Sequence, residues 1–280
     1  MTAPPAEPLF LERPGHGACF ALFHAPAGAC RGAVLYLHPF AEEMNRARRM
    51  AALQARAFAA AGYAVLQLDL HGCGDSSGDF GDASWDGWLD DVAHAAGWLR
   101  ARCAVPVTLW GLRLGALLAL AHARRDPAIA ALLLWQPVVN GATHLTQFLR
   151  LRVAGDMLGN AATATTATAA TTSALRAALA AGETLEVAGY ALSPALALGM
   201  EACDATRMAP ACPVHWIEIT PSPERGPAPA SLRVIEGWRA AGATAELRQV
   251  AGEPFWSTQE IATCPALIEA SLAALEPCYA

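Results

Sequence analysis

Short apolar runs alternate with Ala/Leu-rich helical patterns, and this alternation restricts the fold more than any other feature of the sequence. The expected strands are Ala33–His38, Ala64–Asp69, Val107–Trp110, Ile129–Trp135, Val214–Ile219 and Glu246–Val250. The expected helices are Arg46–Ala61, Trp85–Arg102, Leu114–Arg125, Ser231–Ala241 and Gln259–Leu275. Strands of a parallel sheet are covered on both faces by crossover helices, so they read as continuous apolar runs. The order therefore predicts an α/β fold with a mostly parallel central sheet flanked by helices.

The alternation stops after Asn140 and resumes at Val214. Residues 141–213 contain no convincing strand, and they include a stretch of only alanine and threonine, Ala161–Thr172. We interpret 141–213 as a helical cap or lid inserted into one α/β core formed by 1–140 and 214–280. Upstream of the first parallel strand, Phe20–His24 and a turn at Gly28 predict an antiparallel hairpin at the sheet edge.

Composition narrows the class of protein. Apolar residues make up 54% of the 280 residues and charged residues 16%, so a large core is expected. The net charge of −6 argues against nucleic-acid binding, which needs a basic surface. The N-terminal segment does not resemble a signal peptide, and no apolar run reaches the roughly 18 residues of a membrane span. We therefore expect a cytoplasmic protein that is not an integral membrane protein.

The eight cysteines form no C-x-x-C pair, and no Cys/His cluster has the spacing of zinc ligands. We expect free thiols in a reducing compartment and neither a metal ion nor a cofactor.

One segment, LWGLRLGALLAL from Leu109 to Leu120, has the pattern of a nucleophile elbow. In that motif, G-x-S-x-G, a serine stands on a sharp strand-to-helix turn between two glycines. Here Gly111 and Gly115 supply the glycines, but Arg113 stands at the apex. A guanidinium is protonated at any working pH and has no lone pair with which to attack an acyl group.

The loops after the other strands extend this comparison. His38-Pro39-Phe40 and the D-x-x-G-x-G-x-S segment Asp69–Ser76 resemble loops of the α/β-hydrolase superfamily, and the resemblance runs from about Ala18 to Leu275. It implies an α/β-hydrolase fold and an oxyanion-binding region after the first parallel strand.

The usual acid and histidine of a catalytic triad are not evident. Glu218 ends the strand that follows the cap, four residues earlier than expected for the acid, and Glu224 is the other candidate there. The loop after the last strand carries Glu253 instead of a histidine, and no histidine follows His215. At the triad-equivalent positions the catalytic candidates are therefore Arg113, Glu218 and Glu253.

A narrower resemblance rests on several strings together. HPFAEEMN, RRMAALQARAFAAAGYAVLQLDLHGCGDSSGDF, LWGLRLGA and GEPFW resemble the exosortase A system-associated hydrolase 2 family. That resemblance implies a bacterial exopolysaccharide and protein-sorting context, with the arginine elbow and GEPFW as part of the family pattern. It also implies a possible partner, a second hydrolase-like protein of the same system.

Arg113 has two interpretations. Beside a helix N-terminus, its guanidinium would bind a carboxylate or phosphate of a ligand. Alternatively, it forms an internal ion pair with Glu253, Glu218, Glu42 or Glu43. That pair would fill the place of the active site in other α/β hydrolases. The residues expected around a ligand or oxyanion are His38, Phe40, Glu42, Glu43, His71 and Leu114.

Three functions remain open from the sequence. The first is an unusual hydrolase or acyl transferase acting on an ester or thioester, with Arg113 as an electrostatic stabiliser. The second is a non-catalytic binder of an anionic, acyl or lipid-like small molecule. The third is a protein-interaction component.

Overall fold

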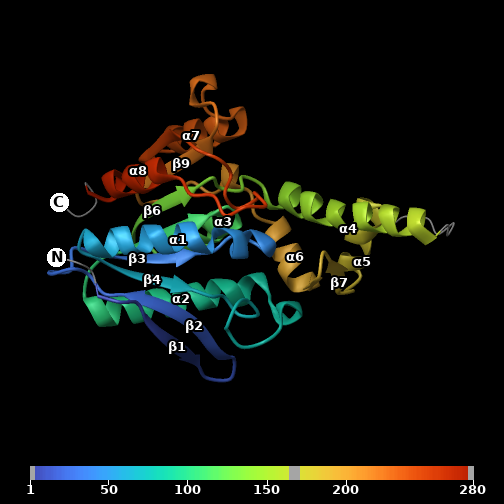
Figure 1. Ribbon diagram of the computed structural model, residues 1–280, viewed down its shortest axis with the longest axis horizontal. Helices are drawn as coiled ribbons and strands as arrows, with labels where there is room; N and C mark the ends of the chain where they lie inside the picture. The colour runs from blue at the N-terminus through green and yellow to red at the C-terminus, as the bar shows by residue number, and fades with distance from the viewer. Residues whose placement is uncertain (1–3, 164–170, 277–280) are drawn as a thin grey trace.

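The computed structural model describes residues 4–163 and 171–276, and an eight-stranded sheet lies at its centre (Figure 1). The strands lie in the order β1-β2-β4-β3-β5-β6-β9-β10. Their bounds are β1 Glu7–Arg13, β2 Gly17–His24, β3 Gly32–Leu37, β4 Tyr63–Leu68, β5 Val107–Leu112, β6 Ile129–Trp135, β9 Val214–Thr220 and β10 Ala245–Ala251. Neighbouring strands from β4 to β10 are parallel, whereas β1 and β2 are antiparallel. The predicted α/β fold with a mostly parallel sheet is confirmed.

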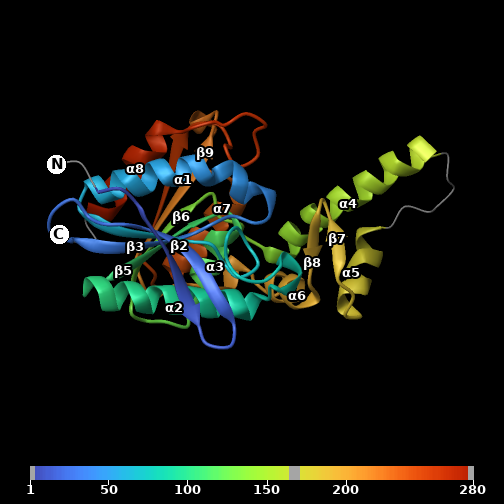
Figure 2. The same ribbon diagram turned by 60° about the horizontal axis from the view of Figure 1, so that its bottom comes forward.

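Helices cover both faces of this sheet and divide the apolar core in two (Figure 2). One face carries α1 (Glu42–Ala60) and α8 (Pro265–Leu275). The other carries α2 (Trp85–Cys103), α3 (Leu114–Ala123) and α7 (Pro229–Ala240). Strands β3 and β5 are buried along their whole length, as their continuous apolar runs indicate. None of the helices in the described residues is long and apolar enough to cross a bilayer.

Two sequence-based boundaries are wrong. The hairpin at the sheet edge pairs β2 with β1 through a turn at residues 14–16, and Gly28 lies after it. Helix α8 begins at Pro265 rather than at Gln259. Proline lacks a backbone N–H and disfavours helical geometry in the residue before it, so it is tolerated at the start of a helix but not inside one.

Residues 141–213 leave the sheet after β6 and return to it at β9. They contain α4 (Gly141–Thr163), α5 (Thr172–Ala180), α6 (Pro194–Glu201) and the 3-10 turn η2 (Ala205–Arg207). Figures 1 and 2 place these helices together at one end of the molecule, with α4 extending away from the sheet. Part of the alanine/threonine stretch, residues 164–170, lies outside the described residues.

The expectation that this insertion has no strand is wrong, because β7 (Leu185–Val187) pairs with β8 (Tyr190–Leu192). The turn between them has positive φ angles at Ala188 (50°) and Gly189 (84°), as in a two-residue I′ hairpin. Three-residue strands are too short to show an alternating pattern in the sequence.

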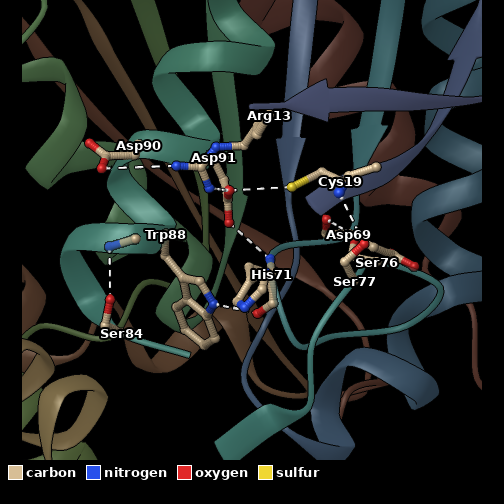
Figure 3. Close-up of polar contacts among 12 residues, drawn as sticks. Arg13, Cys19, Asp69, His71, Ser76, Ser77, Ser84, Trp88, Asp90 and Asp91 are labelled. Atoms are coloured by element: carbon tan, nitrogen blue, oxygen red, sulfur yellow. Dashed lines mark hydrogen bonds and ion pairs between the residues drawn. The ribbon is translucent and has the colours of Figure 1, made fainter. Parts of the chain in front are cut away.

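A buried carboxylate joins the edge hairpin to α2 (Figure 3). Asp91 of α2 is 1% exposed and forms an ion pair with Arg13 of β1. It also accepts hydrogen bonds from the thiol of Cys19 at 3.3 Å and from the amide of His71 at 2.9 Å. Burial, followed by the charge of Asp91, raises the pKa of the Cys19 thiol to about 12. The network therefore holds a neutral thiol and an ion pair between β1, β2 and α2.

Three residues other than glycine adopt positive φ angles where parallel strands end. Ala41 (50°) follows β3, Arg113 (56°) follows β5 and Gln136 (41°) follows β6. Such conformations cost roughly 1–3 kcal/mol each and gather at functional sites. Since the carboxyl ends of parallel strands share one edge, this strain marks the edge where ligands bind in open α/β sheets.

Candidate functional site

The turn from β5 into α3 has the geometry of a nucleophile elbow. Arg113 occupies its apex with φ 56° and ψ −116°. A Cβ at Gly111 would lie 2.5 Å from the carbonyl oxygen of Gly115, and one at Gly115 would lie 2.2 Å from the carbonyl oxygen of Leu37. Both glycines are therefore required by close backbone approach, as the motif indicates.

The Arg113 side chain is held by a carboxylate and an indole. Its Nε donates to Oε1 of Glu43 at 3.3 Å, and its Cζ lies 5.6 Å from the ring centroid of Trp256. Both members of the ion pair are partly buried, with side-chain exposures of 20% for Arg113 and 23% for Glu43. Among the described residues, the terminal amino groups of Arg113 form no hydrogen bond. Both terminal amino groups thus remain able to donate hydrogen bonds to a ligand.

Two cavities meet at Arg113. The larger has a volume of about 500 Å³ and runs from Arg113 past Asn140 and Asp204 to Arg233 on α7. The smaller, of about 170 Å³, is more apolar and lies against Phe40 and neighbouring side chains of α4. The larger volume is within the range of small-molecule sites. Two cations, Arg113 and Arg233, and one carboxylate, Asp204, line the larger cavity.

His144 on α4 lines both cavities and was not singled out from the sequence. It is 7% exposed, and neither ring nitrogen has a hydrogen-bond partner in the described structure. Its ring packs edge-on against Phe40, with centroids 5.7 Å apart. The only local signal was a histidine in the first turn of the helix after a parallel strand. Its place near Arg113 depends on the strand order, because α3 and α4 follow the neighbouring strands β5 and β6.

Phe40 and Leu114 lie where the oxyanion region was expected. Phe40 is buried beside Phe148 of α4, with ring centroids 4.9 Å apart. Leu114 is the first residue of α3, and its amide has no acceptor among the described residues. This amide and the adjacent Arg113 guanidinium present donors at one helix N-terminus.

His38 and His71 do not line these two cavities. His38 is buried, with Nδ1 2.8 Å from the Pro39 carbonyl oxygen and Nε2 accepting from the Leu70 amide at 3.3 Å. Burial lowers the pKa of the His38 imidazole, so the ring is neutral. Its hydrogen bond with the Leu70 amide holds the loop after β4 in place. His71 contributes backbone contacts instead, and its carbonyl oxygen accepts a hydrogen bond from the indole of Trp88 (Figure 3).

The remaining carboxylate candidates lie elsewhere. Glu218 is buried and accepts from the Ala228 amide at 3.2 Å and from Nε2 of Gln249 at 3.3 Å. Glu253 is exposed, and no ion pair joins it to Arg113. Glu42 accepts from Tyr190 of β8 at 3.2 Å, which links α1 to the insertion. Four carboxylates were expected as alternative ion-pair partners of Arg113. In the structure its partner is Glu43.

Within the described part of the chain, no group of three or more His, Cys, Asp or Glu side chains is arranged to hold a metal ion. The cysteines there form no disulfide bond.

A family model described as "Serine aminopeptidase, S33" matches residues 28–196, which is more than half of the chain. The chain belongs to this family of α/β hydrolases. No curated protein matches its sequence. The S33 family name refers to a serine enzyme, whereas this member carries Arg113 at the apex of its elbow.

Solved structures share the fold of this S33 member over nearly its whole length. GrgF, an α/β hydrolase from Penicillium sp. sh18, is 17% identical, with a TM-score of 0.65 over 99% of each chain. A carboxyl esterase from Bacillus coagulans is 15% identical, with a TM-score of 0.65 over 99% of this chain and 100% of its own. Est1E from Butyrivibrio proteoclasticus is 13% identical, with a TM-score of 0.62 over 97% of this chain and 98% of its own. At these identities the similarity establishes the α/β-hydrolase fold.

The environment of His144 predicts a specific pH dependence of stability. Burial, followed by the Arg113 charge, lowers the pKa of its imidazole to about 3. Below the ordinary value of 6.5 the unfolded chain binds a proton that the folded chain does not, so folding stability is lost as the pH falls from 6.5 toward 3. Relative to His144→Gln, the wild type is expected to lose about 1.4 kcal/mol per pH unit in this window.

Urea unfolding of both proteins between pH 4 and 8 measures this difference. Burial raises the pKa of the Glu43 carboxyl and Arg113 opposes the rise, but both groups are present in both proteins. A constant difference in unfolding free energy across this range would show that His144 takes up its proton in the fold.

Proposed function

We propose that this protein binds a carboxylate- or phosphate-bearing small molecule at Arg113. One observation carries the proposal. The Arg113 guanidinium stands at the elbow apex beside a cavity of about 500 Å³, and only its Nε is hydrogen-bonded to described residues. A guanidinium with two free amino groups matches the paired oxygens of a carboxylate or phosphate.

The charges around the cavity support the same conclusion. Arg233 on α7 adds a second cation to the lining of the cavity. The carboxylate of Asp204 already accepts from the amide of Thr206 at 2.9 Å and from Nδ2 of Asn140 at 3.2 Å. The pKa of Asp204 lies below its ordinary value because these hydrogen bonds outweigh its burial. Two cations thus line the cavity, and hydrogen bonds already occupy both oxygens of its one carboxylate.

Hydrolysis through a serine at the elbow is not part of this proposal. The hydroxyl groups of Ser76 and Ser77, in the loop after β4, accept hydrogen bonds from backbone amides of β2. Ser76 accepts from the Phe20 amide and Ser77 from the Ala18 amide. The loop after β10 carries Phe255 and Trp256, and both are buried. A nucleophile paired with a base, which a serine hydrolase requires, does not occur around Arg113 in the described residues.

We also propose that residues 141–213 act as a lid and that the protein works in the cytoplasm. Helix α4 brings His144 and Gln147 to the cavity, which supports the first point. The absence of disulfide bonds among the described cysteines supports the second. The resemblance to exosortase A system-associated hydrolase 2 proteins supports a role in that exopolysaccharide system, beside a second hydrolase-like protein.

Isothermal titration with benzoate and phenyl phosphate, at fixed ionic strength, tests the binding proposal. Arg113→Gln is expected to weaken binding of the preferred anion roughly 10- to 100-fold, because a charged hydrogen-bonding pair is lost. Glu43→Gln is expected to strengthen binding, because it removes the internal carboxylate that competes for the guanidinium.

Arg49→Gln is the matched control, because Arg49 is an exposed arginine of α1 outside the cavity. It should bind like the wild type. The proposal fails if the wild type binds neither anion, or if Arg113→Gln binds as tightly as the wild type.

His144 favours a second function, hydrolysis of an ester or thioester without a serine. A neutral imidazole with unpaired nitrogens beside a guanidinium can orient a water molecule toward a polarised carbonyl. Turnover of p-nitrophenyl esters or acyl-CoA thioesters by the wild type, lost in both Arg113→Ala and His144→Gln, would establish this function. Under the binding proposal all three proteins are inert.

A further inference from the structure

His144 is a buried polar group without a partner, and such groups are uncommon. The ring is more than nine-tenths buried, and both of its nitrogens lack hydrogen bonds to the described residues. Leaving a buried polar group unsatisfied destabilises the folded state. A neutral imidazole offers one donor and one acceptor. The position therefore suits a ligand group that both donates and accepts, and a hydroxyl is such a group.

The same face of α4 carries two more polar side chains that can form hydrogen bonds with a ligand. Thr143 and Gln147 are four residues apart, so they lie one above the other on the helix, and both line the larger cavity with His144. In the described structure neither side chain forms a hydrogen bond, whereas the side chain of Asn140 is used by the Thr143 amide and by Asp204. Side chains that carry a hydroxyl, an imidazole and an amide thus line one cavity.

We infer that the ligand is a polyhydroxylated anion, with its carboxylate or phosphate on Arg113 and its hydroxyl groups on His144 and Gln147. This inference rests on the proposed function and names the class of its ligand. An acyl chain in the larger cavity would leave these polar groups without hydrogen bonds, and each unpaired group would weaken its binding. Arg233, which also lines the cavity, would bind a second acidic or hydroxyl group of the same ligand.

Matched pairs of probes test this class. Quinate and cyclohexanecarboxylate share a six-membered ring and a carboxylate, but only quinate carries ring hydroxyls. Glucose 6-phosphate and cyclohexyl phosphate form the corresponding phosphate pair. By isothermal titration, the wild type is expected to bind the hydroxylated member of the preferred pair at least about tenfold more tightly. The two pairs also distinguish a carboxylate from a phosphate headgroup.

His144→Phe keeps a ring of similar size and removes both hydrogen-bonding nitrogens. It is expected to bring the two members of the preferred pair within about threefold of each other, mainly by weakening the hydroxylated one. Gln147→Leu, at an exposed position where folding is not at risk, should reduce the preference in the same direction. The control is His94→Phe, the same change at an exposed histidine of α2 outside the cavity.

Equal binding of both members by the wild type, still dependent on Arg113, would overturn the hydroxylated class and leave the anion site standing. Tighter binding of octanoate than of quinate would also overturn the hydroxylated class, and it would favour an acyl ligand. If no anion binds, the proposed function fails and this inference fails with it. A preference that survives His144→Phe unchanged would also contradict the assignment of the hydroxyl site to His144.

Discussion

Asp91→Ala is expected to lower the free energy of unfolding by about 3–5 kcal/mol, because it leaves the Arg13 cation buried without its partner. The Asp91 side chain is fully buried and that of Arg13 is only 12% exposed, so water cannot replace the lost carboxylate. The change also removes the acceptor for the Cys19 thiol and for the His71 amide (Figure 3). Urea unfolding monitored by tryptophan fluorescence measures the loss.

Asp90→Ala provides a matched control on the next residue of the same helix. The Asp90 carboxylate lies 4.0 Å from the same arginine, but its side chain is 69% exposed. Exposed ion pairs contribute about 0–1 kcal/mol, so this variant should be close to the wild type. Similar values for Asp90→Ala and Asp91→Ala would show that burial of the pair does not determine its contribution.

Gly115→Ala is expected to destabilise the protein by more than about 3 kcal/mol or to prevent folding. The new Cβ would lie 2.2 Å from the Leu37 carbonyl oxygen and 2.5 Å from that of His38. Both obstacles are backbone atoms of the strand that packs against the start of α3, so α3 would have to move away from β3. The yield of folded protein and its thermal midpoint measure the effect.

Gly97→Ala tests the same substitution in a helix without a close neighbour. A Cβ at Gly97 in α2 has no atom within 4 Å, so the helix gains the propensity of alanine. An increase of roughly 0.5–1 kcal/mol in stability is expected. Near-wild-type stability of Gly115→Ala would mean that the elbow tolerates a wider separation of α3 and β3 than the structure shows.

Local patterns in the sequence were sufficient for the fold. The continuous apolar run of β6 and the glycines at 111 and 115 are local signals, so the sheet and the elbow were predicted correctly. The turn of the edge hairpin was predicted at Gly28, whereas it lies at Pro14-Gly15, a dipeptide that is itself typical of turns. Strand β1 alternates only weakly, which made its pairing with β2 difficult to see.

The candidate site was only partly accessible from the sequence. Arg113 followed from the elbow motif, but its choice of Glu43 depends on the rotation of α1, which separates neighbouring residues Glu42 and Glu43 onto different faces. His144 lines the same cavities because α4 follows β6, the neighbour of β5 in the sheet, and no local pattern specifies this strand order. Contacts between distant segments therefore account for what sequence analysis missed.

The left-handed torsion at position 113 has a consequence for how this scaffold diversifies. The angle is imposed by packing at Gly111 and Gly115, so it belongs to the backbone and not to the arginine. A side chain that tolerates this torsion would therefore occupy the same partly buried place beside the cavity. A change of one codon can therefore exchange the guanidinium for another chemical group while the surrounding architecture stays intact.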